Sequence, residues 1–141
     1  MYRKPDWEAR LAAYLEPLRL RPFGPWGTYD CCVFTDGGIV AMTDTSLMGE
    51  FVGRYSTPIG AARVLKRYGA GTLEATIDRK LEPIPAALAQ RGDVVMSHGL
   101  LGICWTDFMF AVGSEGEREG LIRIERWSWG DPRAWRVPYG A

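Results

Sequence analysis

Hydrophobic residues in the first half of the chain recur at helical spacing. The pattern predicts four helices, from Pro5 to near residues 19–22, from Cys31 to about Ala41, over residues 57–69, and over residues 72–80. The first helix has one apolar face, formed by Trp7, Leu11, Tyr14, Leu15 and Leu18. Two adjacent glycines interrupt the second, and such a pair often permits close approach by a neighbouring backbone.

From Gly92 onwards the pattern changes to short runs of apolar and β-branched residues. Five strands are predicted, over residues 93–97, 100–106, 108–112, 121–125 and 134–137. His98 and Gly99 suit a tight hairpin turn between the first two strands, and Asp107 suits a second turn. Helices over about residues 5–81, followed by antiparallel strands over about 92–137, predict a single α+β domain spanning residues 1–141.

The composition describes a globular protein without a net charge. Apolar residues make up 47% of the chain, and 17 Lys and Arg residues balance 17 Asp and Glu residues. A neutral chain has no overall attraction to nucleic acid or to an anionic membrane, so we expect neither as a partner. The scattered basic residues near the N-terminus are expected on a solvated surface: Arg3, Lys4, Arg10, Arg19 and Arg21.

The cysteines and the N-terminus indicate a protein made in a reducing cytoplasm. The first residues lack the continuous apolar core of a signal peptide, and the longest apolar run, residues 100–105, is too short to span a membrane. Three cysteines, two of them adjacent, form no disulfide framework. With one histidine and no Cys-x-x-Cys spacing, we expect no metal site and no cofactor.

Candidate chemistry centres on Cys31. Turn-forming residues precede Asp30, whose carboxylate can accept hydrogen bonds from the unpaired N–H groups of a first helical turn. Cys31 then lies in that turn, where the positive end of the helix dipole favours a thiolate. This placement suits a nucleophile. The alternative is that Cys31 and Cys32 are small buried residues, as we expect for Cys104, and that Asp30 is only a cap.

Four short motifs occur in order along the chain. They are Trp26-Gly27, Asp30-Cys31 at a helix start, Gly92-Asp93-Val94-Val95, and Leu100-Leu101-Gly102-Ile103. In this order the chain resembles the NlpC-type, papain-like cell-wall cysteine peptidases, and most closely the small phage and prophage tail proteins related to them. The resemblance covers about residues 23–112. It implies a papain-like fold, in which the helix that begins with the cysteine packs on an antiparallel sheet or small barrel.

The chain departs from the family pattern where a general base is needed. Leu100 occupies the position of the family's catalytic histidine, and residues 108–112, where the resemblance places a third polar residue, are all apolar. General-base assistance typically contributes ~10²–10⁴-fold in rate, so its loss would severely weaken hydrolysis. His98 is a candidate base, displaced by about 6.6 Å along an extended strand, so the loop would have to fold back. Cys32 and Val33 also replace the family's serine and glycine.

The resemblance implies two alternative functions. The first is a structural protein of a phage or prophage tail tip or baseplate, made in the host cytoplasm, located in the virion tail and acting through other tail proteins. The alternative is a peptidoglycan amidohydrolase, in which Cys31 attacks a stem-peptide carbonyl to open the cell wall during DNA delivery. An α+β domain of other ancestry is a third interpretation.

Several tryptophans near the C-terminus are candidates for contact with a partner protein. Trp127, Trp129 and Trp135 lie among arginines, and aromatic and Arg residues are frequent in the energetic centres of protein interfaces. The alternative is that these indoles close the core. Six Trp in 141 residues exceed what one core of this size easily buries, so we expect at least one of them on the surface.

Overall fold

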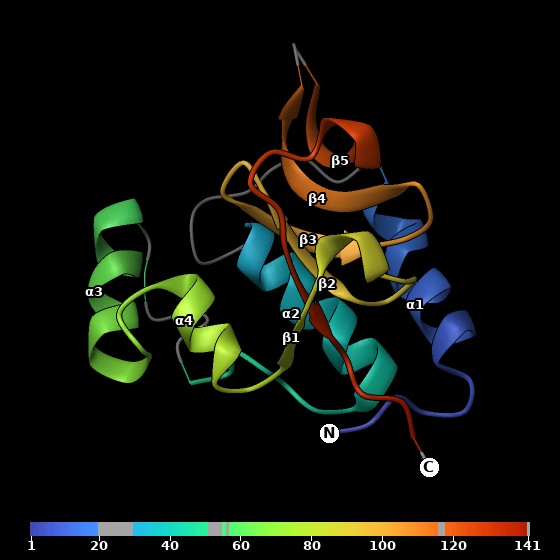
Figure 1. Ribbon diagram of the computed structural model, residues 1–141, viewed down its shortest axis with the longest axis horizontal. Coiled ribbons are helices and arrows are strands. Elements are labelled where there is room, and N and C mark those ends of the chain that lie inside the picture. The colour runs from blue at the N-terminus through green and yellow to red at the C-terminus, as the bar shows by residue number, and fades with distance from the viewer. Residues whose placement is uncertain (20–29, 51–54, 56, 116–117, 141) are drawn as a thin grey trace.

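The computed structural model describes residues 1–19, 30–50, 55, 57–115 and 118–140. The four predicted helices are confirmed as α1 (Trp7–Leu15), α2 (Cys31–Thr43), α3 (Pro58–Tyr68) and α4 (Leu73–Asp78), with a 3-10 turn (Glu16–Leu18) that extends the first. In Figure 1, α2 crosses the middle of the molecule, with α1 on one side and α4 and α3 on the other. No helix in these ranges is long and apolar enough to cross a lipid bilayer.

The second half forms one antiparallel sheet of six strands. They are β1 (Glu82–Ile84), β2 (Val94–Ser97), β3 (Leu100–Cys104), β4 (Phe108–Glu115), β5 (Arg118–Glu125) and β6 (Arg133–Arg136), in the spatial order β1-β6-β2-β3-β4-β5. All five predicted strands are present, and the α+β prediction is confirmed. β1 was not predicted because Pro83 indicates a break. Proline is tolerated here because β1 lies at the sheet edge and pairs only with β6.

The sheet buries apolar residues on both faces. On one face, side chains of α1 and α2 pack against Leu101 and Ile103 of β3 to form the main core, and Leu11 and Phe34 are fully buried there. The opposite face carries a smaller cluster that includes Val95, Cys104, Met109 and Ala111. Because side chains alternate along a strand, Leu100 lies in the second cluster while Leu101 lies in the first.

The two glycines of α2 allow neighbouring side chains to approach the helix closely. A Cβ atom on Gly38 would collide with Cδ1 of Ile103, and one on Gly37 would collide with the hydroxyl of Tyr14. The neighbours are therefore side chains of β3 and α1, not the backbone that the sequence led us to expect. The helix continues through both glycines to Thr43.

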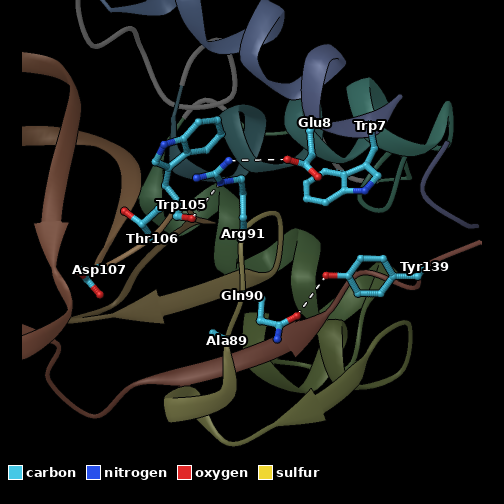
Figure 2. Close-up of a pocket in the computed structure, with 9 residues that line it drawn as sticks. All are labelled: Trp7, Glu8, Ala89, Gln90, Arg91, Trp105, Thr106, Asp107 and Tyr139. Atoms are coloured by element: carbon cyan, nitrogen blue, oxygen red, sulfur yellow. Dashed lines mark hydrogen bonds and ion pairs between the residues drawn. The ribbon is translucent and has the colours of Figure 1, made fainter. Parts of the chain in front are cut away.

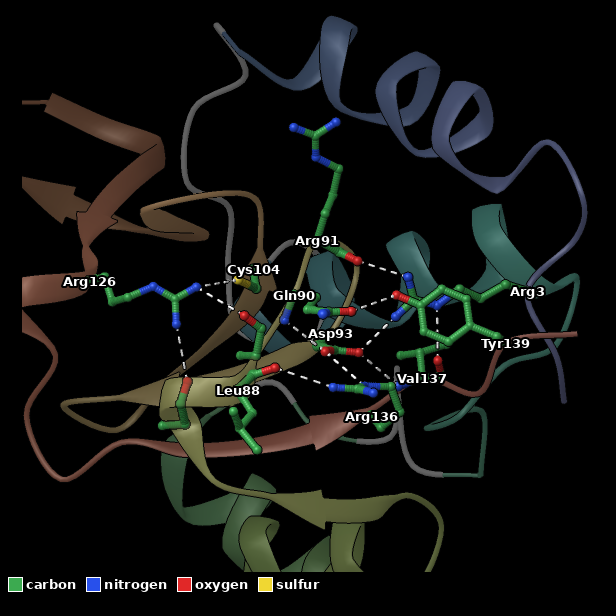
Figure 3. Close-up of polar contacts among 12 residues, drawn as sticks. Arg3, Leu88, Gln90, Arg91, Asp93, Cys104, Arg126, Arg136, Val137 and Tyr139 are labelled. Carbon is green, nitrogen blue, oxygen red and sulfur yellow. Dashed lines mark hydrogen bonds and ion pairs between the residues drawn. The ribbon is translucent and has the colours of Figure 1, made fainter.

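A buried ion pair joins the N-terminal segment to the turn before β2, and its hydrogen bonds extend to the C-terminal segment. Arg3, expected on the surface, is only 3% exposed, which corrects that expectation. Its guanidinium donates to Asp93 Oδ1 at 2.7 Å and to the carbonyl of Val137 at 2.9 Å. The fully buried Asp93 also accepts hydrogen bonds from Arg136 and from the backbone of Gln90 (Figure 3). The guanidinium of Arg3 can be buried because these acceptors replace the hydrogen bonds that it would otherwise form with water.

Candidate functional site

Asp30 caps α2 and places Cys31 in its first turn, as predicted. The carboxylate is 2% exposed, and its Oδ1 accepts a hydrogen bond from the backbone N–H of Val33 at 2.9 Å. Its Oδ2 accepts a second from the hydroxyl of Tyr55, also at 2.9 Å. The backbone of Asp30 is extended, as an N-cap requires. The cap therefore fixes the start of α2, and with it the position of Cys31.

The pKa values of the two adjacent thiols are shifted in opposite directions. A hydrogen bond from Cys32 lowers the pKa of Cys31, and a hydrogen bond from the backbone of Leu101 acts in the same direction against the effect of burial. The same contact with Cys31, together with burial, raises the pKa of Cys32. Both cysteines are free and half-buried. Cys31 is thus the residue of the pair that becomes the thiolate.

Tyr55 is a member of this site that the sequence did not reveal. It lies between α2 and α3, 25 residues after Asp30, and no local pattern connects the two. Burial, followed by the charges of Cys32 and Asp30, raises the pKa of its phenol, so the hydroxyl stays protonated and acts as a donor. Tyr55 therefore supports the cap and the thiol pair, and it is no general base.

His98 lies in the predicted turn, where its contacts are with the segment before β6. His98 and Gly99 have φ values of 52° and 78°, which are typical of a two-residue hairpin turn. Nε2 of His98 donates to the carbonyl of Ser128 at 2.9 Å, and the ring packs on Gly130. Within the described chain no hydrogen bond joins His98 to Cys31. His98 therefore holds the β2–β3 turn in place.

The remaining positions of a catalytic triad carry no base. Leu100 packs in the second core cluster, on the sheet face opposite Cys31, and the residue on the same face as Cys31 is Leu101. Neither leucine can accept a proton, so the site lacks an imidazole whichever of the two corresponds to the family's histidine. β4, predicted to be apolar over residues 108–112, contributes Met109 and Ala111 to the second cluster and Val112 to the first.

The three candidate contact tryptophans have different environments. Trp127 is 87% exposed, which fits the prediction of at least one surface indole. Trp129 is half-buried, and its indole N–H donates to the carbonyl of Ile124 at 2.9 Å. Trp135 is 0% exposed and donates to Asp78 at 2.7 Å, so the prediction of Trp135 as a contact residue is wrong. The core accommodates it because Asp78 satisfies its N–H group.

In the residues that the structure describes, no cluster of three or more His, Cys, Asp or Glu side chains is arranged to hold a metal ion. Cys104 is fully buried in the second cluster, as expected. The Trp26-Gly27 motif and Arg21 lie outside the described residues. What the site offers is a thiol at a helix N-terminus, a neighbouring thiol donor and a protonated phenol.

The sequence matches one protein family over nearly its whole length. Residues 2–137 match a family described as a domain of unknown function, DUF6950. No curated protein matches the chain. The match includes the cap, both thiols and all six strands of the sheet. The chain therefore belongs to the DUF6950 family.

Proposed function

We propose that the chain is a structural protein of a phage or prophage tail tip or baseplate, built on a degenerate papain-like fold of the NlpC type. In this proposal it acts through contacts with other proteins. One observation carries the proposal: Cys31 lies at the N-terminus of α2 against β3, as the nucleophile of a papain-like peptidase would, yet no imidazole is hydrogen-bonded to it in the described chain.

The order and packing of the elements support the papain-like part of the proposal. A helix that begins with the cysteine packs on an antiparallel sheet, and the Gly92-Asp93 motif leads into the second strand. Asp93, directly before this strand, is buried and forms an ion pair with Arg3. These features agree with the layout that the resemblance implies, whereas the base that the layout would need is a leucine.

The surface supports action through protein contacts. Trp127 exposes 87% of its surface to water, which is uncommon for so large an apolar side chain. Exposed Trp residues are frequent anchors in protein interfaces, because burial of the indole removes much apolar area from water. We expect Trp127 to contact a neighbouring tail protein in the assembled particle.

A cell-wall digestion assay tests the structural function against the enzymatic one. Purified peptidoglycan is incubated with the wild-type protein, with Cys31→Ser, and with an active amidohydrolase as positive control. We expect no release of stem peptides by either form of this chain, because proton transfer from Cys31 has no acceptor. Release by the wild type alone would overturn the structural proposal.

The location in the virion is tested separately. Particles produced by the phage or prophage that encodes the chain are purified, and their tails are separated from their heads. An antibody against the chain should detect it in the tail fraction. Detection only in the soluble fraction of the lysate contradicts the tail assignment, whatever the digestion assay shows.

The second candidate function is a peptidoglycan amidohydrolase, and the lowered pKa of Cys31 is the observation that favours it. In this mechanism the Cys31 thiolate attacks a stem-peptide carbonyl carbon, and N–H groups of the first turn of α2 hold the oxyanion. The amide C–N bond then breaks as the leaving amine takes a proton from water, and a second water hydrolyses the thioester and restores the thiol. A lowered thiol pKa supplies the nucleophile without a base. Release that depends on Cys31 in the assay above would establish this function.

A further inference from the structure

A second site lies in a cleft of about 480 Å³ between the start of α1, the turn before β2, and the turn between β3 and β4. Three aromatic residues and several polar residues line it, among them Trp7, Glu8, Gln90, Arg91, Trp105 and Tyr139 (Figure 2). None of the residues around Cys31 lines this cleft. A cleft of this size with aromatic walls and a few polar groups is typical of small-molecule sites.

Arg91 differs from the other arginines around the turn before β2. Arg3, Arg126 and Arg136 each donate at least two hydrogen bonds to Asp93 or to backbone carbonyls (Figure 3). Among the described residues, Arg91 makes one hydrogen bond, from Nε to the carbonyl of Trp105 at 3.3 Å. In the same part of the chain, its terminal nitrogens have one acidic partner, the carboxylate of Glu8, in an ion pair at 3.7 Å from NH1.

The guanidinium of Arg91 is nevertheless held in place. It lies over the ring of Trp105 at 4.5 Å from the ring centre, and its Nε is bonded to the carbonyl of the same residue. Glu8 is its nearest carboxylate, 3.7 Å from NH1, and this side chain is 64% exposed. An exposed ion pair at this separation contributes little, so a better acceptor can replace Glu8.

The geometry of this guanidinium indicates an anionic ligand of a particular kind. Two adjacent terminal nitrogens of an arginine match the two oxygens of a carboxylate, which can accept parallel hydrogen bonds. Next to Arg91, the rings of Trp7 and Tyr139 provide apolar wall, and the hydroxyl of Tyr139 is bonded to Gln90 at 3.3 Å. The cleft therefore combines a carboxylate receptor with surfaces for an apolar body.

We propose that this cleft binds a small molecule in which a carboxylate is attached to an apolar ring or chain. In the complex, Arg91 binds the carboxylate through both terminal nitrogens, Glu8 turns away from Arg91 into solvent, and the aromatic side chains that line the cleft cover the apolar body. The proposal concerns a different site from Cys31, and it does not depend on the phage-tail function.

Benzoate is the probe that tests the proposal, because it joins a carboxylate directly to a ring. Binding to the full chain is measured by calorimetry and by chemical shifts of the indole N–H groups. We expect saturable benzoate binding at millimolar concentrations, and at least about tenfold weaker binding of neutral benzamide, of benzylamine and of inorganic phosphate. Equal binding of benzamide or phosphate, or no saturable benzoate binding, would overturn the proposal.

Three variants identify the residues involved. Arg91→Gln should weaken benzoate binding about tenfold or more, whereas Glu8→Gln should strengthen it about two- to fivefold, because the competing carboxylate is gone. Arg123→Gln is the matched control: Arg123 also stacks on an aromatic ring, that of Phe108, and lies 3.7 Å from the carboxylate of Glu125, but it lines no part of this cleft.

The variants Arg123→Gln and Glu8→Gln distinguish a loss of benzoate binding from a general loss of folding. Each variant is first checked for an unchanged urea midpoint. Loss of affinity that is equal in Arg91→Gln and Arg123→Gln contradicts the proposal, and so does a weaker affinity in Glu8→Gln. A general structural role for Glu8 would not predict that its removal increases affinity.

Discussion

Asp30 uses one carboxylate for two tasks, each with a different oxygen. One oxygen accepts the N–H of Val33 and the other accepts the hydroxyl of Tyr55. We predict that Asp30→Ala lowers the free energy of unfolding by about 2–4 kcal/mol, because it removes the cap and also the bond that the carboxylate accepts from the Tyr55 hydroxyl. Urea denaturation measures this change.

Tyr55→Phe is the control for this prediction, because it keeps the cap and removes only the hydroxyl, which is bonded to Asp30 and to Cys32. Its expected cost is about 1–2 kcal/mol, because one hydrogen bond typically contributes about 1 kcal/mol net. An Asp30→Ala variant that is no less stable than Tyr55→Phe would show that the cap contributes nothing.

The opposite pKa shifts of Cys31 and Cys32 predict that the two thiols react with an alkylating reagent over different pH ranges. Only the thiolate reacts with iodoacetamide, so labelling of Cys31 should reach half its maximum rate below the pH expected of an ordinary thiol. In Cys32→Ala the donor is absent, and the midpoint should move to higher pH. Labelled peptides identified by mass spectrometry give the rate at each cysteine.

Cys104 is the internal reference in this experiment. It is fully buried, and burial raises the pKa of its thiol, so it should react slowly at every pH at which the protein is folded. A Cys31 profile that resembles a free thiol, or one that Cys32→Ala leaves unchanged, would contradict the arrangement of the two thiols.

At the level of elements, the close contact between α2 and β3 depends on Gly38, which has no side chain to collide with Ile103. Alanine normally stabilises a helix interior by about 1 kcal/mol relative to glycine. At Gly38 we predict the opposite, a loss of about 1–3 kcal/mol in Gly38→Ala, because the new Cβ would collide with Cδ1 of Ile103. Thermal or urea unfolding provides the measurement.

A double variant tests this explanation directly. Ile103→Val removes Cδ1, so in the background of Ile103→Val the substitution Gly38→Ala should cost less, or should even stabilise the protein. If the two substitutions are additive, the collision is not the cause of the loss.

The elements themselves could be predicted, whereas their arrangement could not. Helices and strands follow from spacings of two to four residues, and α3 and α4 lie within the predicted ranges, each capped by the threonine that precedes it, Thr57 and Thr72. β1 was not predicted, because a proline such as Pro83 is compatible both with a turn and with an edge strand. The position of β6 between β1 and β2 rests on contacts about 40 to 50 residues apart, which no local pattern contains.

The same distinction applies to the candidate sites. Asp30 and Cys31 could be predicted because a cap and a first turn are adjacent in sequence. Tyr55 and the cleft around Arg91 could not, since each joins residues from separate elements. For His98, the turn could be predicted because it is local. The hydrogen bond of its side chain could not, because the acceptor, the carbonyl of Ser128, lies 30 residues away in the sequence.

At the scale of the whole molecule, the ion pair of Arg3 and Asp93 connects segments 90 residues apart. We predict that Arg3→Met lowers the free energy of unfolding by about 2–4 kcal/mol, because buried Asp93 loses one of its two arginine partners and the carbonyls of Arg91 and Val137 lose a donor. The measurement is urea denaturation. Arg19→Met is the control: it breaks an exposed pair with Glu16 and should change stability by no more than about 0.5 kcal/mol.

β6 follows every other described element, yet it lies inside the sheet. While the chain emerges from the ribosome, α1 and α2 can pair and the strands from β2 to β5 can form a meander, but β1 has no partner. Until β6 inserts, β2 presents an open edge on which another nascent chain could pair. Maturation of this domain therefore has a late step that is vulnerable to aggregation, and a chaperone that shields the edge of β2 would increase its yield.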